Sequence, residues 1–139
     1  MKIQLKFEIK PMAKQSFRTT RTGNKYLDAS VIKYRKAIRN MAIAQMRNQK
    51  AEKIEGAVNM NIIYAFRRPQ SLSKKERNEI DNGKIFPKTT KPDIDNLTKA
   101  ILDALNGIVW KDDAQVTQIK IQKVWSSKDQ IEVEIWETK

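Results

Sequence analysis

Four segments of the chain alternate apolar and polar side chains with a period of two, and this pattern constrains the fold more than any other feature of the sequence. The segments are residues 2–10, 57–66, 116–125 and 131–135. Alternation of this kind predicts half-buried β-strands, with one face on a core and the other toward solvent. The turn-forming residues 126–129 separate the last two segments, which favours an antiparallel hairpin between them.

Two further segments carry apolar side chains at the three- and four-residue spacing of amphipathic helices. Residues 30–49 start with Ser30, a suitable N-cap. Residues 97–106 follow Asp95 and Asn96, either of which is placed to cap the second helix. The sequence therefore predicts two main helices.

A third, short helix is indicated by a capping-box pattern, in which Glu76 follows Ser73 by three positions. It has little apolar surface, so we expect it at the periphery. The order of elements is then strand, helix, strand, short helix, helix, strand, strand. This order predicts an α/β (α+β) fold, with one mixed β-sheet of about four strands and two main helices packed on it.

The size and charge of the chain narrow its function class. Its 139 residues suffice for one domain with its own core, so residues 1–139 are predicted to form a single domain. With 28 Lys plus Arg against 16 Asp plus Glu, the formal net charge is +12, which favours a polyanionic partner, nucleic acid ahead of a membrane surface. No apolar run is long enough for a signal peptide or a transmembrane span, so we expect no membrane partner and a cytoplasmic location.

The sequence contains neither Cys nor His, and this excludes several kinds of site. Without Cys there are no disulfides, zinc-thiolate sites or thiol nucleophiles. Without His there are no imidazole ligands, no His general base and no Ser-His-Asp triad. Any catalysis must therefore use carboxylates, Lys, Tyr or Ser.

Residues 91–116 concentrate five carboxylates in an otherwise basic chain. Asp93 and Asp95 lie at or just ahead of the second main helix, and Asp112 and Asp113 occupy the turn before the next strand. If that turn folds back beside the helix start, three or four carboxylates converge, and like charges at short range require a cation or a proton. An all-oxygen site suits Mg²⁺, or Mn²⁺ as a substitute, and such ions act on phosphodiesters. The stretch therefore predicts a metal-dependent nuclease site.

Lys99 follows Asp95 by four positions, so it lies one helical turn further along the same face. There it is placed to hold an attacking water or to offset charge on a pentacovalent phosphate. The alternative is a surface ion pair between Lys99 and Asp103, four residues on. The aspartates have an alternative task as well, because Asp is common at helix caps and in turns.

Five basic residues in two predicted loops are candidate phosphate contacts: Lys14, Arg18, Arg21, Lys88 and Lys91. In the first loop, residues 11–26, small polar and hydroxyl side chains space the charges. This composition suits contacts that position a DNA backbone without reading its bases. The alternative for that segment is a solvated loop.

Three short motifs stand out within the acidic stretch. They are D-x-D-N-x-x-K at residues 93–99, D-A-L-N-G at residues 103–107 and D-D-x-Q-V at residues 112–116. Together they resemble the signature of the RusA family of Holliday junction resolvases. Pro11, Lys14, Arg18, Gly23 and Tyr26 are also similar to that family's N-terminal pattern, so the resemblance extends over nearly the whole chain and implies a RusA-like fold.

The resemblance implies a homodimeric, Mg²⁺-dependent endonuclease that resolves four-way DNA junctions by paired, symmetric nicks in recombination and repair. Such enzymes are often encoded by phages or prophages. Matched position by position, Asp93, Asp95 and Asp113 correspond to the family's metal-binding aspartates and Lys99 to its essential lysine. Asp112 takes the role of Asp113 if the segment between helix and turn differs by one residue in length.

Two-fold symmetry suits a four-way junction, because an isologous dimer presents two identical sites to two equivalent strands. Two alternatives to a junction resolvase stay open on the sequence. One is a basic DNA-binding protein without catalysis, whose aspartates only cap helices. The other is a nuclease that acts mainly on other branched DNA, such as flaps.

Overall fold

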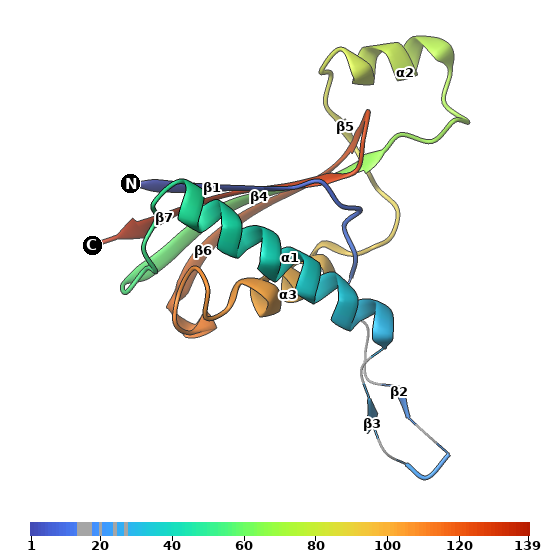
Figure 1. The fold of residues 1–139 in the computed structure, drawn as a ribbon. Helices are drawn as coiled ribbons and strands as arrows, with labels where there is room; N and C mark the ends of the chain where they lie inside the picture. The colour runs from blue at the N-terminus through green and yellow to red at the C-terminus, as the bar shows by residue number, and fades with distance from the viewer. Residues whose placement is uncertain (14–17, 20, 24, 27) are drawn as a thin grey trace.

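The computed structural model describes residues 1–13, 18–19, 21–23, 25–26 and 28–139, and its regular elements are labelled in Figure 1. The strands are β1 (Lys2–Phe7), β2 (Arg18–Thr19), β3 (Lys25–Tyr26), β4 (Ala57–Arg67), β5 (Phe86–Pro87), β6 (Val116–Ser126) and β7 (Gln130–Thr138). The helices are α1 (Ala29–Asn48), α2 (Lys74–Asp81) and α3 (Ile94–Leu105), with a short 3₁₀ helix, η1 (Asp113–Gln115).

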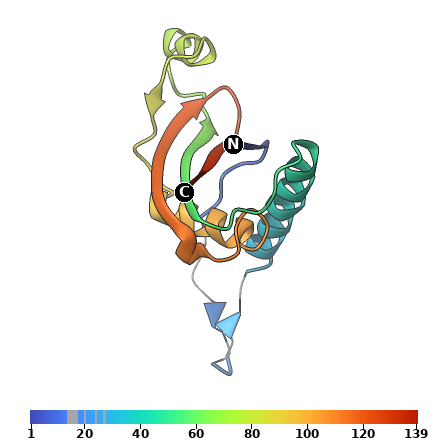
Figure 2. The ribbon, with the colours of Figure 1, turned by 90° about the vertical axis from the view of Figure 1, so that its left-hand side faces the viewer.

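Five strands form one mixed sheet in the order β1-β7-β4-β6-β5. β4 and β6 run parallel, and the other neighbours pair antiparallel. α1 and α3 pack against each other on one face of the sheet (Figure 1 and Figure 2). The predicted fold class is therefore confirmed. The fifth strand is the two-residue β5, which is too short to produce an alternating pattern.

The alternating segments place one row of apolar side chains from each long strand under the helices. In β1, Ile3, Leu5 and Phe7 are buried, while the residues between them are exposed. β7 follows the same alternation, and β4, at the centre of the sheet, is buried along most of its length. Leu97 of α3 and Trp110 are fully buried in the core that the sheet and helices enclose.

The predicted hairpin between the last two strands is wrong. β4 lies between β6 and β7, so residues 127–129 pass over the end of β4. Two hydrogen bonds hold this crossing: Arg67 N–H donates to Asp129 Oδ1 (2.7 Å), and Arg68 N–H donates to Ser126 O (2.8 Å). Neighbouring strands are only about 4.8 Å apart, so a short loop can straddle one strand. The sequence indicates the turn but does not indicate that β4 lies between the two strands that the turn connects.

Both main helices start earlier than predicted. The N-cap of α1 is Asp28, whose Oδ1 accepts a hydrogen bond from Ser30 N–H (2.8 Å), so Ser30 lies in the first turn. The N-cap of α3 is Asp93, which corrects the expected cap at Asp95 or Asn96. Each helix start offers several cap-forming residues in succession, and the tertiary packing of the first turn selects among them.

α2 and the β2–β3 hairpin lie at the periphery of the molecule (Figure 1). The predicted cap of α2 is present, because Ser73 Oγ accepts a hydrogen bond from Glu76 N–H (3.1 Å). Part of the predicted N-terminal loop is a hairpin instead: β2 pairs with β3, and Gly23 in the turn has a φ of 86°, a conformation that favours glycine. Of the helices that the structure describes, none has the length and apolar character to cross a bilayer.

Candidate functional site

The start of α3 presents two exposed carboxylates, Asp93 and Asp95. Asp93 is the N-cap residue, yet its side chain accepts no capping hydrogen bond. Within the described part of the chain, neither carboxylate takes part in a hydrogen bond or an ion pair. Both carboxylates are therefore available to a ligand.

A buried pair of hydroxyls ties the first turn of α3 to the sheet. Thr98 Oγ1 donates to Ile94 O (2.7 Å) and lies 3.0 Å from the hydroxyl oxygen of Tyr64 on β4. Burial raises the pKa of Tyr64 well above its usual range. Because the Thr98 hydroxyl already donates to Ile94 O, the Tyr64 hydroxyl is the donor in this pair. This contact fixes the helix start, and with it the two carboxylates, on the central strand.

Two lysines hold the loop that leads into Asp93. Lys88 Nζ donates to Lys91 O (2.6 Å) and to the hydroxyl of Thr90. Lys123 Nζ, from β6, donates to Pro92 O (2.7 Å) and to Thr90 O. The backbone just before Asp93 is thereby fastened to β6.

Lys88, a predicted phosphate contact, has a different setting from the exposed loop that the sequence suggested. The residue is 9% exposed, and its Nζ lies 5.1 Å from the centroid of the Phe66 ring and 4.5 Å from that of Trp125. Burial, followed by the charges of Lys123 and Lys10, lowers the pKa of Lys88. Its ammonium supports the loop and the aromatic rings instead of reaching out toward solvent.

The other candidate phosphate contacts are spread over two regions. Lys14 lies outside the described residues, and only the backbone of Arg18, in β2, is described. Arg21 is exposed in the turn of the β2–β3 hairpin. Lys91 is exposed in the loop just ahead of Asp93. Of the five, the structure brings Lys88 and Lys91 to the start of α3.

Lys99 is exposed on α3, one turn after Asp95. The alternative pairing with Asp103 is not formed, since the Asp103 carboxylate pairs with Arg35 of α1 at 3.8 Å. Among the residues that the structure describes, Lys99 has no ion-pair partner. Its ammonium is therefore free to approach an anion beside Asp95.

Asp112 and Asp113 both have structural contacts. Asp112 is the N-cap of η1, where its Oδ1 accepts from Ala114 N–H (2.9 Å). Asp113 Oδ1 accepts from the indole N–H of Trp110 (2.8 Å). Because Trp110 is fully buried, this bond satisfies a donor that has little access to water.

The expected convergence of the four aspartates is not present. Within the described ranges, no three acidic side chains come close enough to share a metal ion. The turn that carries Asp113 starts beside the far end of α3, where Gly107 N–H donates to Trp110 O (2.8 Å), and does not fold back beside Asp93. The 12 residues of α3 span about 18 Å, which separates the two pairs of carboxylates.

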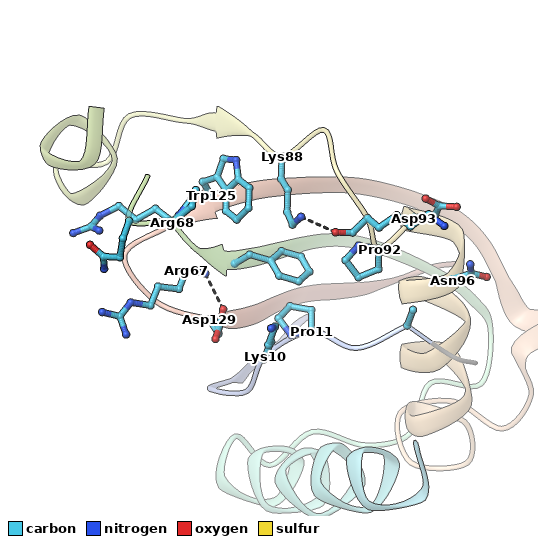
Figure 3. Close-up of a pocket in the computed structure, with 15 residues that line it drawn as sticks. Lys10, Pro11, Arg67, Arg68, Lys88, Pro92, Asp93, Asn96, Trp125 and Asp129 are labelled. Carbon is cyan, nitrogen blue, oxygen red and sulfur yellow. Dashed lines mark hydrogen bonds between the residues drawn. The ribbon is translucent and has the colours of Figure 1, made fainter. Parts of the chain in front are cut away.

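A cleft lies next to Asp93 because two strands outrun the helix that covers them. Thr98, in the first turn of α3, contacts Tyr64 of β4, and the strand continues past this contact to Arg67. Phe66 and Arg67 of β4 and Trp125 of β6 line a cleft of about 1090 Å³ beside the start of α3 (Figure 3). Asp93 and Asn96 lie at one end of this cleft, and Arg67, Arg68 and Asp129 lie at the other.

The cleft combines positive charge with aromatic surface. Its cationic residues are Lys10, Arg67, Arg68, Lys88 and Lys91, against the carboxylates of Asp93 and Asp129. Phe66 and Trp125 contribute its aromatic rings. Sequence reasoning missed Lys10, Arg67, Lys123 and Trp125. The available signal was the basic residues at the ends of the first two predicted strands, Lys10 and Arg67, and these come together because β1 and β4 both pair with β7.

A mixed α+β sheet with a cationic cleft and free carboxylates at its edge defines a domain suited to a polyanionic ligand. Comparison with known protein families identifies the family to which this domain belongs. The sequence model described as "Endodeoxyribonuclease RusA" matches residues 7–136, so the chain belongs to the RusA endodeoxyribonuclease family.

A relative from Bacillus subtilis (strain 168), named "Uncharacterized protein YqaN", is 41% identical over 86 residues. The similarity covers 60% of this chain and 60% of the relative. The resemblance inferred from the three motifs is thus confirmed at the level of the family. The roles of Asp93, Asp95, Lys99, Asp112 and Asp113 stay predictions.

Proposed function

We propose that the protein is a Mg²⁺-dependent endodeoxyribonuclease that resolves Holliday junctions by paired, symmetric nicks. Membership of the RusA family supports the reaction class. The structural observation that carries the proposal is the pair of free carboxylates, Asp93 and Asp95, beside a cleft lined mainly by cations. A phosphodiester drawn to those cations would lie next to the two acids.

The donor set at the start of α3 fits a hard divalent cation. Mg²⁺ is usually held by one or two carboxylates, with water and substrate phosphate completing its shell. Asp93 and Asp95 offer two carboxylates with no competing ion pair among the described residues. The chemistry that the ion supplies when bound is polarisation of the phosphoryl group, and Mn²⁺ is suited to the same oxygen ligands.

The family pattern adds Asp113, or Asp112 in its place, as a third metal ligand. In this structure the Asp113 carboxylate accepts the Trp110 indole N–H. A carboxylate has a second oxygen and further lone pairs, so this bond leaves it able to ligate an ion. Bringing Asp113 to Asp93 requires a rearrangement of the turn at residues 107–113 on binding DNA and metal.

The remaining residues of the proposed site bind and position the DNA. Lys99 offsets negative charge that builds on the phosphoryl oxygens as the bond breaks. Lys91 and Arg67, at opposite ends of the cleft, hold phosphates on either side of the one that is cut. A two-fold homodimer places a second, identical site on the equivalent strand of the junction.

Cleavage of an immobile four-way junction, with and without Mg²⁺, tests the proposal. The wild-type protein should yield two symmetric nicks only when Mg²⁺ is present. Asp93→Asn should bind the junction with unchanged or higher affinity and cleave it at least a hundredfold more slowly, because one metal ligand is lost. Asp103→Asn, which removes the same charge from the same helix, is the matched control and should cleave like the wild type.

Unchanged cleavage by Asp93→Asn would rule out the assignment of the site. The contacts of Asp112 and Asp113 are the observation that favours the non-catalytic alternative. Junction binding that does not depend on Mg²⁺, with no nicking of any DNA, would support that alternative. Product lengths from junction, flap and linear substrates separate a junction resolvase from a nuclease for other branched DNA.

A further inference from the structure

We propose that the cleft beside Asp93 is a subsite for an unpaired nucleotide of the DNA strand, whose base packs on Trp125 while its phosphates contact Lys10, Arg67 and Lys91. The inference rests on the proposed function for the identity of the polymer, and it adds which form of DNA the site takes. It makes Trp125 a positioning residue that fixes the strand relative to the carboxylates.

The aromatic side chains of this region come from paired positions on three neighbouring strands. Trp125 on β6 is in register with Phe66 on β4 and with Phe86 on β5. Residues in register project from the same face of a sheet. Phe66 is buried, whereas Trp125 is half-buried and lines the cleft, so part of its large ring system is open to a ligand.

The charges around these rings favour an anion. Lys10, Arg67 and Lys91 have no ion-pair partner among the described residues, while Arg68 is already paired with Asp81 at 2.9 Å. Lys88 is held close enough to Lys10 and Lys123 for their charges to lower its pKa, so the cations repel one another when the cleft holds no anion. Phosphate groups entering the cleft would relieve this repulsion.

A partly open aromatic ring among cations favours an unpaired nucleotide over a base pair. Inside a duplex both faces of each base are covered by its stacked neighbours, and only the edges are accessible in the grooves. An aromatic side chain gains from a base only when the base face is free, as in single strands and at opened branch points. The cleft volume of about 1090 Å³ is slightly above the range of roughly 300–1,000 Å³ typical of ligand pockets, so the cleft has room for a nucleotide and its flanking phosphates.

The position of the cleft links this subsite to cleavage. Asp93 and Asn96 form the end of the cleft nearest α3, and Trp125 lies between that end and Arg67 (Figure 3). A strand whose base rests on Trp125 therefore runs its next phosphate toward the first turn of α3. The cut is accordingly expected one or two phosphates from the unpaired nucleotide.

Intrinsic tryptophan fluorescence tests the subsite without any cleavage. The probe is tetrathymidylate in EDTA, and the control is a short duplex at the same nucleotide concentration. The single strand should quench the wild-type signal, and quenching should be lost in Trp125→Phe. The matched control is Trp136→Phe. Trp136 is on β7, where its ring contacts Lys2 of β1, and it does not line the cleft. This variant should be quenched like the wild type.

The loss of affinity is measured with a second variant. Trp125→Leu should bind tetrathymidylate about tenfold more weakly than the wild type, the effect usual for removing one stacking residue. Its far-ultraviolet circular dichroism should match the wild type, and if it does not, the quenching comparison with Trp125→Phe decides alone. Equal quenching of the Trp125→Phe and wild-type proteins, or equal quenching by the duplex, would overturn the proposal.

The two proposals fail in different ways. Quenching that depends on Trp125, in a protein that nicks no junction, would reject the nuclease and keep the nucleotide subsite. Junction cleavage in Mg²⁺, without any Trp125-dependent quenching, would reject the subsite and keep the nuclease.

Discussion

Asp113 combines a structural contact with a predicted role in metal binding, and two substitutions separate them. Asp113→Ala leaves the buried indole N–H of Trp110 without an acceptor and should lower the free energy of unfolding by about 1–3 kcal/mol. Asp113→Asn keeps an acceptor oxygen and should lose less stability, while it should cleave junctions poorly because the negative charge is gone. Urea denaturation and junction cleavage measure the two effects, and full cleavage by the Asn variant would show that the carboxylate is structural alone.

Lys99 is exposed and has no ion pair among the described residues, so its removal should not affect folding. We expect Lys99→Met to reduce the cleavage rate of a bound junction by about 10²–10³, the usual effect of removing one group that stabilises the transition state, and to leave the melting temperature unchanged. Lys120→Met, at an exposed lysine of β6, is the control. Equal single-turnover rates for the two variants would contradict the role of Lys99.

At the scale of residues, the sequence identified the acids and lysine of the start of α3 but not their surroundings. Asp93, Asp95 and Lys99 carry their signal in spacing along one helix, which can be read from a single segment. Lys123 and Trp125 lie about thirty positions later. Lys123 contacts the loop at residues 90–92, and Trp125 contacts Lys88, only because β6 runs beside that loop. No pattern within one segment of the sequence indicates that these side chains lie close together.

Two hydroxyls join the helix α3 to the strand β4, and a double-mutant cycle measures this connection. Thr98→Val leaves the Tyr64 hydroxyl buried without its partner and should cost about 1–3 kcal/mol of unfolding free energy. Tyr64→Phe in the same chain removes that unsatisfied group, so the double variant should be more stable than the sum of the two single losses predicts. Additive losses in urea denaturation would show that the hydroxyls do not interact.

At the scale of elements, the existence and type of the long segments were predictable and their arrangement was not. The alternation over residues 116–125 and 131–135 gave two strands, and the turn between them suggested a hairpin. β4 enters between these strands because its almost continuous burial needs neighbours on both sides, and that requirement arises from a segment some fifty residues earlier. The start of α3 was misplaced for a related reason, since Asp93, Asp95 and Asn96 are all competent caps.

The whole molecule should lose stability in alkali because it buries tyrosines. Burial raises the pKa of Tyr34 to about 12 and raises that of Tyr64 as well, whereas tyrosine in an unfolded chain titrates near pH 10. Above pH 10 the unfolded chain releases protons that the folded protein retains, so the stabilisation is complete below pH 10 and declines as the pH rises toward 12. For Tyr34 alone the loss by pH 12 is about 2 kcal/mol.

Urea denaturation between pH 8 and pH 12 measures this decline. Tyr34→Phe should show a shallower fall above pH 10 than the wild type, with no difference in slope below it. A wild-type stability that stays constant from pH 10 to pH 12 would contradict the assignment of the shifted groups.

The ends of β4 and β6 extend past the first turn of α3 and line the cleft beside Asp93. The rest of the sheet packs with α1 and α3 in the hydrophobic core. Phe66, next to the end of β4, still belongs to the core, whereas Arg67, the last residue of the strand, is exposed. A homologous chain with a different residue at the position of Arg67 can therefore change what the cleft binds and still fold in the same way.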